Sequence, residues 1–282
     1  MNKTSVLALI LAFIALTTVF MKQPSQNKTY HETRLEQVKR TGVIRCGYMV
    51  WPPFLKKDMR TGALDGLLYD LIEEIGRQLK LKIEWTTETT WGQMLTDLSM
   101  NRFDMACVPA FVNPARAREA DFISPLFYAP INLYARKGDT RFDNNYEAAN
   151  VAEVKFAAQD GQFTGVVANE MFPNATKVSI PQLTGGEDLY VMVGTNKADV
   201  IISDPYSYAN FTTKNDDSLR LVLGSPLRVA AIGFPVPSNE PAFKNMLATT
   251  VIYLQDSGFF DKTIKKHEGT IKTLRAAKHY EE

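Results

Sequence analysis

The sequence has little of what enzymes usually depend on. Its only histidines are His31, His267 and His279, and none of them lies at a metal-ligand spacing. It contains no glycine-rich phosphate loop, no nucleophile elbow and no pairing of cysteine with histidine at a known spacing. We therefore expect no metal, no cofactor and no catalytic residue, and we predict that the protein is not an enzyme.

Charge of one sign is not in excess either. The chain has 32 Lys and Arg residues against 31 Asp and Glu residues, and no run of Lys or Arg is longer than a pair. A nucleic-acid-binding protein usually carries a basic patch or stripe. We therefore expect no nucleic-acid partner.

Cysteine is scarce, and Cys46 and Cys107 are the only two. A lipoprotein needs a cysteine directly after its N-terminal apolar run, and this chain has none there. The position of the two cysteines therefore argues against a lipid anchor.

An uncharged, apolar run over residues 4–21 follows Lys3, and a polar stretch comes after it. A terminal run that is apolar on every face predicts export. Its length lies between that of a signal-peptide core and that of a spanning helix of ~20 residues, and no clear small-residue cleavage site ends it. Residues 1–22 are thus either a signal peptide or an N-terminal membrane anchor.

The length of the chain predicts two folded parts. Single cores rarely grow beyond ~250 residues and domains cluster near ~100 to 150. At 282 residues, with 45% hydrophobic residues, the chain suits two lobes that each bury a core.

Strands and helices alternate along the sequence. Apolar periodicity predicts a first series with strands at 43–49, 82–87 and 103–110 and helices at 67–81 and 91–101. A second series has strands at 131–138, 154–161, 177–182 and 198–204 and helices at 164–171 and 187–195. A β-rich stretch at 219–237 and a helix at 241–256 follow. This alternation predicts an α/β fold in which each lobe is a mainly parallel sheet flanked by helices.

Ligands of such folds bind beyond the carboxyl ends of the strands. Asp204 stands at such an end, because it follows an apolar run and precedes Pro205. Its side chain could face a crevice between the lobes, or it could simply cap the following helix. Position alone leaves both interpretations open.

The chain resembles the type II periplasmic solute-binding proteins, in particular the polar amino-acid binders of ABC transporters, which are bacterial extracellular solute-binding proteins of family 3. The resemblance covers roughly residues 41–267. The segments that carry it are TGVIRCGYMVWPPF, DGLLYDLIEEIGRQL, NRFDMACVPAF, NPARAREADFISPLFYA, LYARKG, AAQDG, ADVIISDPYSYANF and DSGFFDKTIKK.

The resemblance implies a site for an α-amino acid. It assigns Arg116, in the segment NPAR, to the ligand carboxylate, and Asp204 to the ligand ammonium. Trp51 is implied to line the pocket over the ligand side chain. Gly161 and Gln162 match a turn at a helix start whose N–H groups attract a carboxylate.

The chain departs from the family pattern around this site. A short Gly-x-Thr segment of the family appears here as residues 109–111, which end in Phe111. The first loop includes Tyr48 and lacks the Asp that basic-amino-acid binders use there. The absence of this Asp disfavours lysine, arginine or histidine as the ligand. Phe163 replaces a small hydroxyl residue, so Phe111 and Phe163 add two aromatic rings. We therefore include Tyr48, Phe111 and Phe163 among the expected ligand-binding residues.

The family fold also bears on the cysteines. Cys46 and Cys107 are predicted at the ends of neighbouring strands in a 2-1-3 sheet. In an exported protein they could form a disulfide, or they could remain two buried thiols that pack as small hydrophobes.

The resemblance implies capture by closure of two lobes. Lobe 1 is expected to comprise residues 41–129 and 224–267, lobe 2 residues 130–223, and a C-terminal tail residues 268–282. The expected protein is a periplasmic monomer that delivers an amino acid, or a similar zwitterion or organic acid, to an ABC transporter permease. Two alternatives stay open: a lyase on the same fold that resembles cyclohexadienyl dehydratase, and a membrane-tethered ligand sensor.

Overall fold

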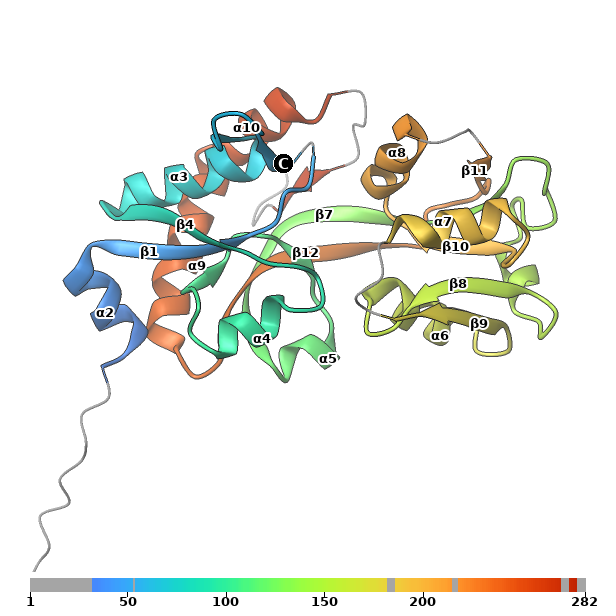
Figure 1. Ribbon diagram of the computed structural model, residues 1–282, viewed down its shortest axis with the longest axis horizontal. Coiled ribbons are helices and arrows are strands. Elements are labelled where there is room, and N and C mark those ends of the chain that lie inside the picture. The colour runs from blue at the N-terminus through green and yellow to red at the C-terminus, as the bar shows by residue number, and fades with distance from the viewer. Residues whose placement is uncertain (1–31, 53, 182–185, 215–217, 270–273, 278–282) are drawn as a thin grey trace, which may run out of the picture. The chain divides into compact units, whose positions relative to one another are not determined.

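The computed structural model describes residues 32–52, 54–181, 186–214, 218–269 and 274–277 (Figure 1). By compactness the chain divides into Met1–Thr33 and Arg34–Glu282, and every element named below belongs to the second unit. The export segment predicted at residues 1–22 lies outside the described residues and stays a prediction.

Lobe 1 is our name for the elements that pack around a parallel sheet in the order β4-β1-β5. Its strands are β1 (Val43–Tyr48), β4 (Lys82–Glu88) and β5 (Met105–Ala106), with a small hairpin of β2 (Lys56–Lys57) and β3 (Leu64–Asp65). Its helices are α2 (Arg34–Thr41), α3 (Leu67–Leu79), α4 (Met94–Ser99), α5 (Pro114–Ala117), α9 (Pro241–Asp256) and α10 (Phe259–His267). The order β4-β1-β5 is the predicted 2-1-3 order.

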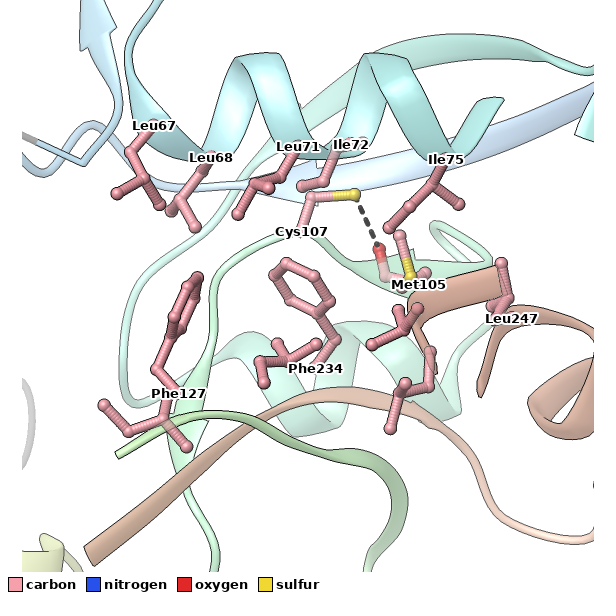
Figure 2. Packing of buried hydrophobic residues seen from close by; sticks show 14 of the residues in the cluster. Leu67, Leu68, Leu71, Ile72, Ile75, Met105, Cys107, Phe127, Phe234 and Leu247 are labelled. Atoms are coloured by element: carbon pink, nitrogen blue, oxygen red, sulfur yellow. Dashed lines mark hydrogen bonds between the residues drawn. The ribbon is translucent and has the colours of Figure 1, made fainter. Parts of the chain in front are cut away.

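Helix α3 illustrates why the sequence folds in this way. Its apolar residues recur at helical spacing, so Leu68, Leu71 and Ile75 are buried on one face. The helix ends where Lys80 adopts a left-handed conformation with φ 57°. Figure 2 shows this apolar face of α3 directed toward Phe127 and Phe234, which come from the two long strands of the fold.

Lobe 2 is our name for the elements that flank the parallel strands β10-β8-β9. Its strands are β8 (Lys155–Gln159), β9 (Thr176–Ile180), β10 (Val200–Ser203) and β11 (Leu219–Leu221). Its helices are the 3-10 turn Tyr146–Ala149, α6 (Phe163–Met171), α7 (Glu187–Gly194) and α8 (Pro205–Lys214). Two apolar clusters on this sheet form a core separate from that of lobe 1.

Two long strands belong to both lobes. Strands β7 (Ala120–Arg136) and β12 (Arg228–Pro237) run antiparallel to each other, and Figure 1 shows them side by side between the two groups of elements. β7 contributes Phe127 to the core of lobe 1 and Leu133 to that of lobe 2. The lobes are therefore connected through strands whose two ends are anchored in different cores.

The edges of this mixed sheet carry two short strands. β6 (Ala110–Phe111) pairs with β12, and β13 (Arg275–Ala276) pairs with β7. The predicted C-terminal tail at 268–282 thus contributes a strand at its described positions. The lobe boundaries predicted at 41–129, 224–267 and 130–223 stay predictions, because β7 and β12 cross between the cores.

Cys46 and Cys107 are joined in a disulfide, with their Cα atoms 5.5 Å apart. In the parallel register, Cys46 lies beside Met105 on β5, and Cys107 follows two residues later. Both cysteines are fully buried. The dashed line in Figure 2 marks the 3.8 Å contact of Cys107 Sγ with the carbonyl oxygen of Met105. Of the two states that the sequence left open, the structure has the disulfide.

The disulfide is expected to stabilise the fold, because it closes a loop whose ends are 61 residues apart. Reduction should lower the free energy of unfolding of the wild-type protein by about 2–4 kcal/mol. Denaturant titration with and without reductant measures this difference. The Cys46→Ala/Cys107→Ala variant is the control, because its midpoint should not respond to reductant. Two titratable thiols in the unreduced, denatured protein would contradict the bond.

Candidate functional site

A cavity of about 500 Å³ is lined by residues of both lobes. Lobe 1 contributes Met49, Thr89 and Trp91, and lobe 2 contributes Gln159 and Ser203. Several of these residues end a strand or directly follow one, as Thr89 follows β4, Gln159 ends β8 and Ser203 ends β10. The cavity thus lies beyond the carboxyl ends of the parallel strands, where ligands of α/β sheets bind.

Arg116 enters this cavity from the short helix α5. The carboxamide oxygen of Asn113 caps the helix by accepting the backbone N–H of Arg116 at 3.0 Å. The guanidinium donates to the carbonyl oxygen of Phe111 at 3.1 Å and to Gln162 Oε1 at 3.3 Å. Burial lowers the pKa of Arg116, and the charge of Glu119 acts in the opposite direction. The side chain is 9% exposed, and both of these acceptors are uncharged.

Asp204 enters the cavity from the start of α8. Its Oδ1 accepts the backbone N–H groups of Tyr206 and Ser207 at 3.0 and 2.9 Å, and its Oδ2 accepts the Ser207 hydroxyl at 2.7 Å. It therefore caps α8, which was one of the two predicted roles. Because it also lines the cavity and is 9% exposed, the second role is compatible with the first.

Tyr206 connects this corner of lobe 2 to lobe 1. Its ring packs with the lobe 1 core, 4.7 Å from the ring of Phe54 between centroids. Its hydroxyl donates to Glu268 at 2.8 Å and accepts the backbone N–H of Leu274 at 3.2 Å. In this arrangement of the lobes, the first turn of α8, which Asp204 caps, is therefore in contact with lobe 1.

Arg116 and Asp204 differ from the other buried charges of the described chain. Five charged residues are buried there, and three of these, Arg34, Asp97 and Asp104, form ion pairs. Asp104 pairs with Arg34 at 2.6 Å, and Asp97 pairs with the exposed Arg102 at 2.8 Å. Arg116 and Asp204 have no oppositely charged partner within 4 Å among the described residues. The two unpaired buried charges are opposite in sign and line the same cavity.

Aromatic side chains form part of the remaining wall. Trp51 lies edge-to-face with Trp91 at a centroid distance of 5.6 Å. Phe111 from lobe 1 stacks on Phe163 from lobe 2 at 4.8 Å, with 17° between the rings. The guanidinium of Arg228 lies 5.0 Å from the centroid of Phe163. The rings of Phe111 and Phe163 therefore form a contact between the lobes.

Gln162 provides a second contact between the lobes. It precedes α6 and accepts a hydrogen bond from Arg116 through Oε1. Its Nε2 is buried and has no hydrogen-bond partner within the described structure. A buried amide donor without a partner is costly, and an acceptor supplied by a ligand would relieve that cost.

Six of the eight predicted site residues line the cavity: Arg116, Asp204, Trp51, Phe111, Gln162 and Phe163. Two are not among the lining residues. Tyr48 packs edge-to-face on Trp85 in the lobe 1 core, and its hydroxyl accepts from Lys57 Nζ at 3.3 Å. Gly161 is exposed and forms the turn before α6 with φ +71°. Their predicted contact with ligand remains a prediction.

Several lining residues were not predicted. Gln159, Ser203 and Tyr190 line the cavity from lobe 2, and the Tyr190 hydroxyl shares a 2.5 Å hydrogen bond with Ser203. Burial, with a contribution from the charge of Asp204, raises the pKa of Tyr190 well above its usual value. Gln159 and Ser203 could have been found by applying the strand-end rule to every strand of lobe 2. Tyr190 lies within α7, where the sequence gives no such signal.

The described residues contain neither a metal-binding cluster nor a membrane-spanning helix. No group of three or more His, Cys, Asp or Glu residues that could hold a metal ion occurs among the residues with described positions. None of the helices in the described part of the chain combines the length and the apolar character that a membrane span needs.

The model of one protein family, bacterial extracellular solute-binding proteins, family 3, matches residues 44–270. This chain belongs to that family. The predicted membership is confirmed, and with it the prediction of a solute-binding protein with a two-lobed α/β fold.

Individual relatives of this family 3 protein are distant. The amino-acid-binding protein AabA of Dichelobacter nodosus is 23% identical over 73% of this chain and 79% of its own length. The cyclohexadienyl dehydratase of Pseudomonas aeruginosa is 24% identical over 80% of this chain and 83% of its own length, so the relatives include an enzyme. The amino acid ABC transporter substrate-binding protein AbpA of Streptococcus pneumoniae, solved bound to L-arginine, has a TM-score of 0.65 at 20% identity and covers 82% of this chain and 97% of its own. At this identity the structural likeness shows the fold alone.

Proposed function

We propose that the protein captures an α-amino acid, or a similar small zwitterion or organic acid, outside the cytoplasm and delivers it to an ABC-type uptake permease. The observation that carries this proposal is the pair of buried, unpaired and opposite charges, Arg116 and Asp204, in one cavity. A buried charge without a partner is strongly unfavourable. An α-amino acid brings the two missing partners in one molecule.

In this proposal Arg116 binds the ligand carboxylate. Its planar guanidinium can donate two parallel hydrogen bonds to a carboxylate. Gln162 Nε2, which is buried without an acceptor, is a further donor for the same group. Gly161 contributes through its left-handed turn, which directs the chain into α6 at Gln162.

Asp204 binds the ligand ammonium in this proposal, and the α8 cap keeps its carboxylate in a fixed orientation. Because its oxygens accept two backbone N–H groups and one hydroxyl, the charge is positioned before the ligand arrives. Trp51, Phe111 and Phe163 surround the ligand side chain. Tyr48 contributes indirectly, because it positions the loop that follows it, and the next residue, Met49, lines the cavity.

Binding is proposed to stabilise the closed arrangement of two lobes. Arg116 belongs to lobe 1 and Asp204 to lobe 2, so a ligand that holds both charges favours the closed population. Strands β7 and β12 form the hinge, with lobe 1 at residues 41–129 and 224–267 and lobe 2 at 130–223. The contacts that support closure are the Arg116–Gln162 hydrogen bond and the Phe111–Phe163 stack.

The proposed location is the periplasm, and the proposed partner is the permease of an ABC transporter. The family description, which names extracellular proteins, supports a location outside the cytoplasm, and the description of AbpA as an ABC transporter substrate-binding protein supports the partner. We further propose a monomer, exported through residues 1–22, which are removed as a signal peptide or kept as a membrane tether. A retained tether would also suit a ligand sensor, and the mass of the mature N-terminus separates the two cases.

We propose that the protein is not an enzyme. One alternative has a specific observation in its favour: a dehydratase relative exists, and two carboxylates, Asp204 and Glu187, line the cavity. A carboxyl acid in such a cavity could help to expel water from a prephenate-like substrate.

We expect no product when the purified protein is incubated with arogenate or prephenate. Formation of the dehydrated product at a rate proportional to protein concentration would favour the lyase.

Removing the guanidinium should abolish tight binding. Arg116→Ala is expected to weaken amino-acid affinity by about 2–5 kcal/mol, the range for truncating one partner of a buried charge pair. Isothermal titration calorimetry measures the change. Arg118→Ala is the matched control, because Arg118 is exposed two residues further on and should bind like the wild type. Unchanged affinity in Arg116→Ala would remove this residue from the site.

Asp204→Asn separates the two roles of Asp204. Asparagine can still cap α8 through its carbonyl oxygen, so the midpoint of thermal unfolding should stay close to that of the wild type. Because the variant lacks the negative charge, amino-acid affinity should fall at least tenfold in calorimetry. If the variant instead unfolds several degrees earlier and binds normally, Asp204 serves only as a cap.

A further inference from the structure

We propose that the cavity selects α-amino acids with a large, uncharged, aromatic side chain and discriminates against cationic and acidic side chains. This inference rests on the proposed function, since it concerns the part of the ligand that Arg116 and Asp204 do not hold. It is carried by the charges and the rings that line the cavity.

The charges of the lining leave little for an ionised ligand side chain. Among the described lining residues, the charged ones are Arg116, Asp204 and Glu187. In the proposed function, Arg116 binds the ligand carboxylate and Asp204 the ligand ammonium, so neither charge is available to the ligand side chain. Glu187 is exposed at the first turn of α7, where water screens its charge. No second cation lines the cavity in the described structure, so an acidic side chain would lack a partner.

The uncharged wall has polar residues, among them Thr89, Thr90, Gln93, Thr164 and Asn210, and an apolar part that is rich in rings. Beyond the groups proposed for the ligand backbone, it includes Met49, Trp51, Trp91, Phe111, Phe163 and Ile232. Trp51 and Phe111 are half-buried, so part of each ring remains available for contact. Flat rings pack against one another in stacked or edge-to-face arrangements at centroid distances of 4.5–7 Å, and such pairs stabilise beyond their buried area. An aromatic ligand side chain would extend the existing Trp51–Trp91 and Phe111–Phe163 arrangements.

Aromatic walls can also bind cations, which is the main rival interpretation. The position of Arg228 argues against it. Its guanidinium already lies 5.0 Å from the Phe163 ring, and its Nη1 pairs with Glu170 at 2.9 Å. Phe163 thus already has a cation–π partner, whose charge Glu170 offsets. A ligand cation would compete with Arg228 for this ring, whereas a neutral ring would not.

The size of the cavity is compatible with a large side chain. Its volume of about 500 Å³ lies in the lower part of the range of roughly 300–1,000 Å³ found for small-molecule sites. A glycine- or alanine-sized ligand would leave the ring wall without contacts.

The test is a binding panel on the full protein after unfolding and refolding to remove any co-purified ligand. Calorimetry would compare L-phenylalanine, L-tryptophan, L-arginine, L-lysine, L-glutamate and L-alanine at neutral pH. We expect phenylalanine or tryptophan to bind at least tenfold more tightly than the other four. If arginine, lysine, glutamate or alanine binds as tightly or more tightly, the selectivity is wrong and the proposed amino-acid site stands. If none of the six binds, the aromatic selectivity is wrong, and the proposed function fails with it only if the remaining proteinogenic amino acids and small organic acids also do not bind.

A variant pair tests the ring wall directly. Phe111→Leu keeps an apolar side chain but removes the ring and its stack on Phe163, which supports closure. Alanine affinity should therefore also fall, but phenylalanine affinity should fall at least tenfold more. Tyr253→Leu is the matched control, since Tyr253 is 58% exposed on α9 and should leave both affinities unchanged. Equal losses for phenylalanine and alanine in Phe111→Leu would show that Phe111 acts on the whole site, which contradicts the inference.

A last ligand separates the ring from the zwitterion. 3-Phenylpropionate has the ring and the carboxylate of phenylalanine but no ammonium. We expect it to bind at least tenfold more weakly than phenylalanine. Equal affinity would keep the aromatic selectivity and overturn the role of Asp204 in the proposed function.

Discussion

The function of the cavity depends on one constraint. Two opposite charges, Arg116 and Asp204, are buried in it, and neither has an ionic partner. Elsewhere in the described chain, buried charges are paired. Asp104, for example, forms ion pairs with Arg34 and Arg45, which offset the cost of removing its charge from water. Arg116 and Asp204 have only neutral hydrogen-bond partners, which offset part of the desolvation cost but do not pair the charge. Sites that retain such a cost are often those where a ligand completes the pairing.

The architecture explains how two such charges meet. Parallel strands bring their carboxyl ends to one edge, so each lobe supplies loops and helix starts to the same cavity. Arg116 is directed by the Asn113-capped helix α5, and Asp204 by its own cap of α8. Strands β7 and β12 have residues in both cores, which connects the lobes without a flexible linker.

Much of this organisation could be predicted from the sequence. Apolar residues at helical spacing predicted the helices α3, α7 and α9, and short segments rich in apolar and β-branched residues predicted the strands β1, β4, β8 and β10. The short helix α5 was not predicted, and the helix α8 was predicted only as one of two interpretations of Asp204, since each is specified mainly by its cap and by a Pro at its start. The pairing of Cys46 with Cys107 could not be decided either, because it depends on strand register. Gln162 was predicted from resemblance, but its unpartnered Nε2 depends on how the two lobes meet.

The most direct test of the central claim is a crystal structure of the protein with the tightest ligand of the amino-acid panel. We expect the ligand carboxylate within hydrogen-bond distance of the Arg116 guanidinium and its ammonium within hydrogen-bond distance of the Asp204 carboxylate. A ligand in the cavity that touches only one of these two charges, or neither, would contradict the account.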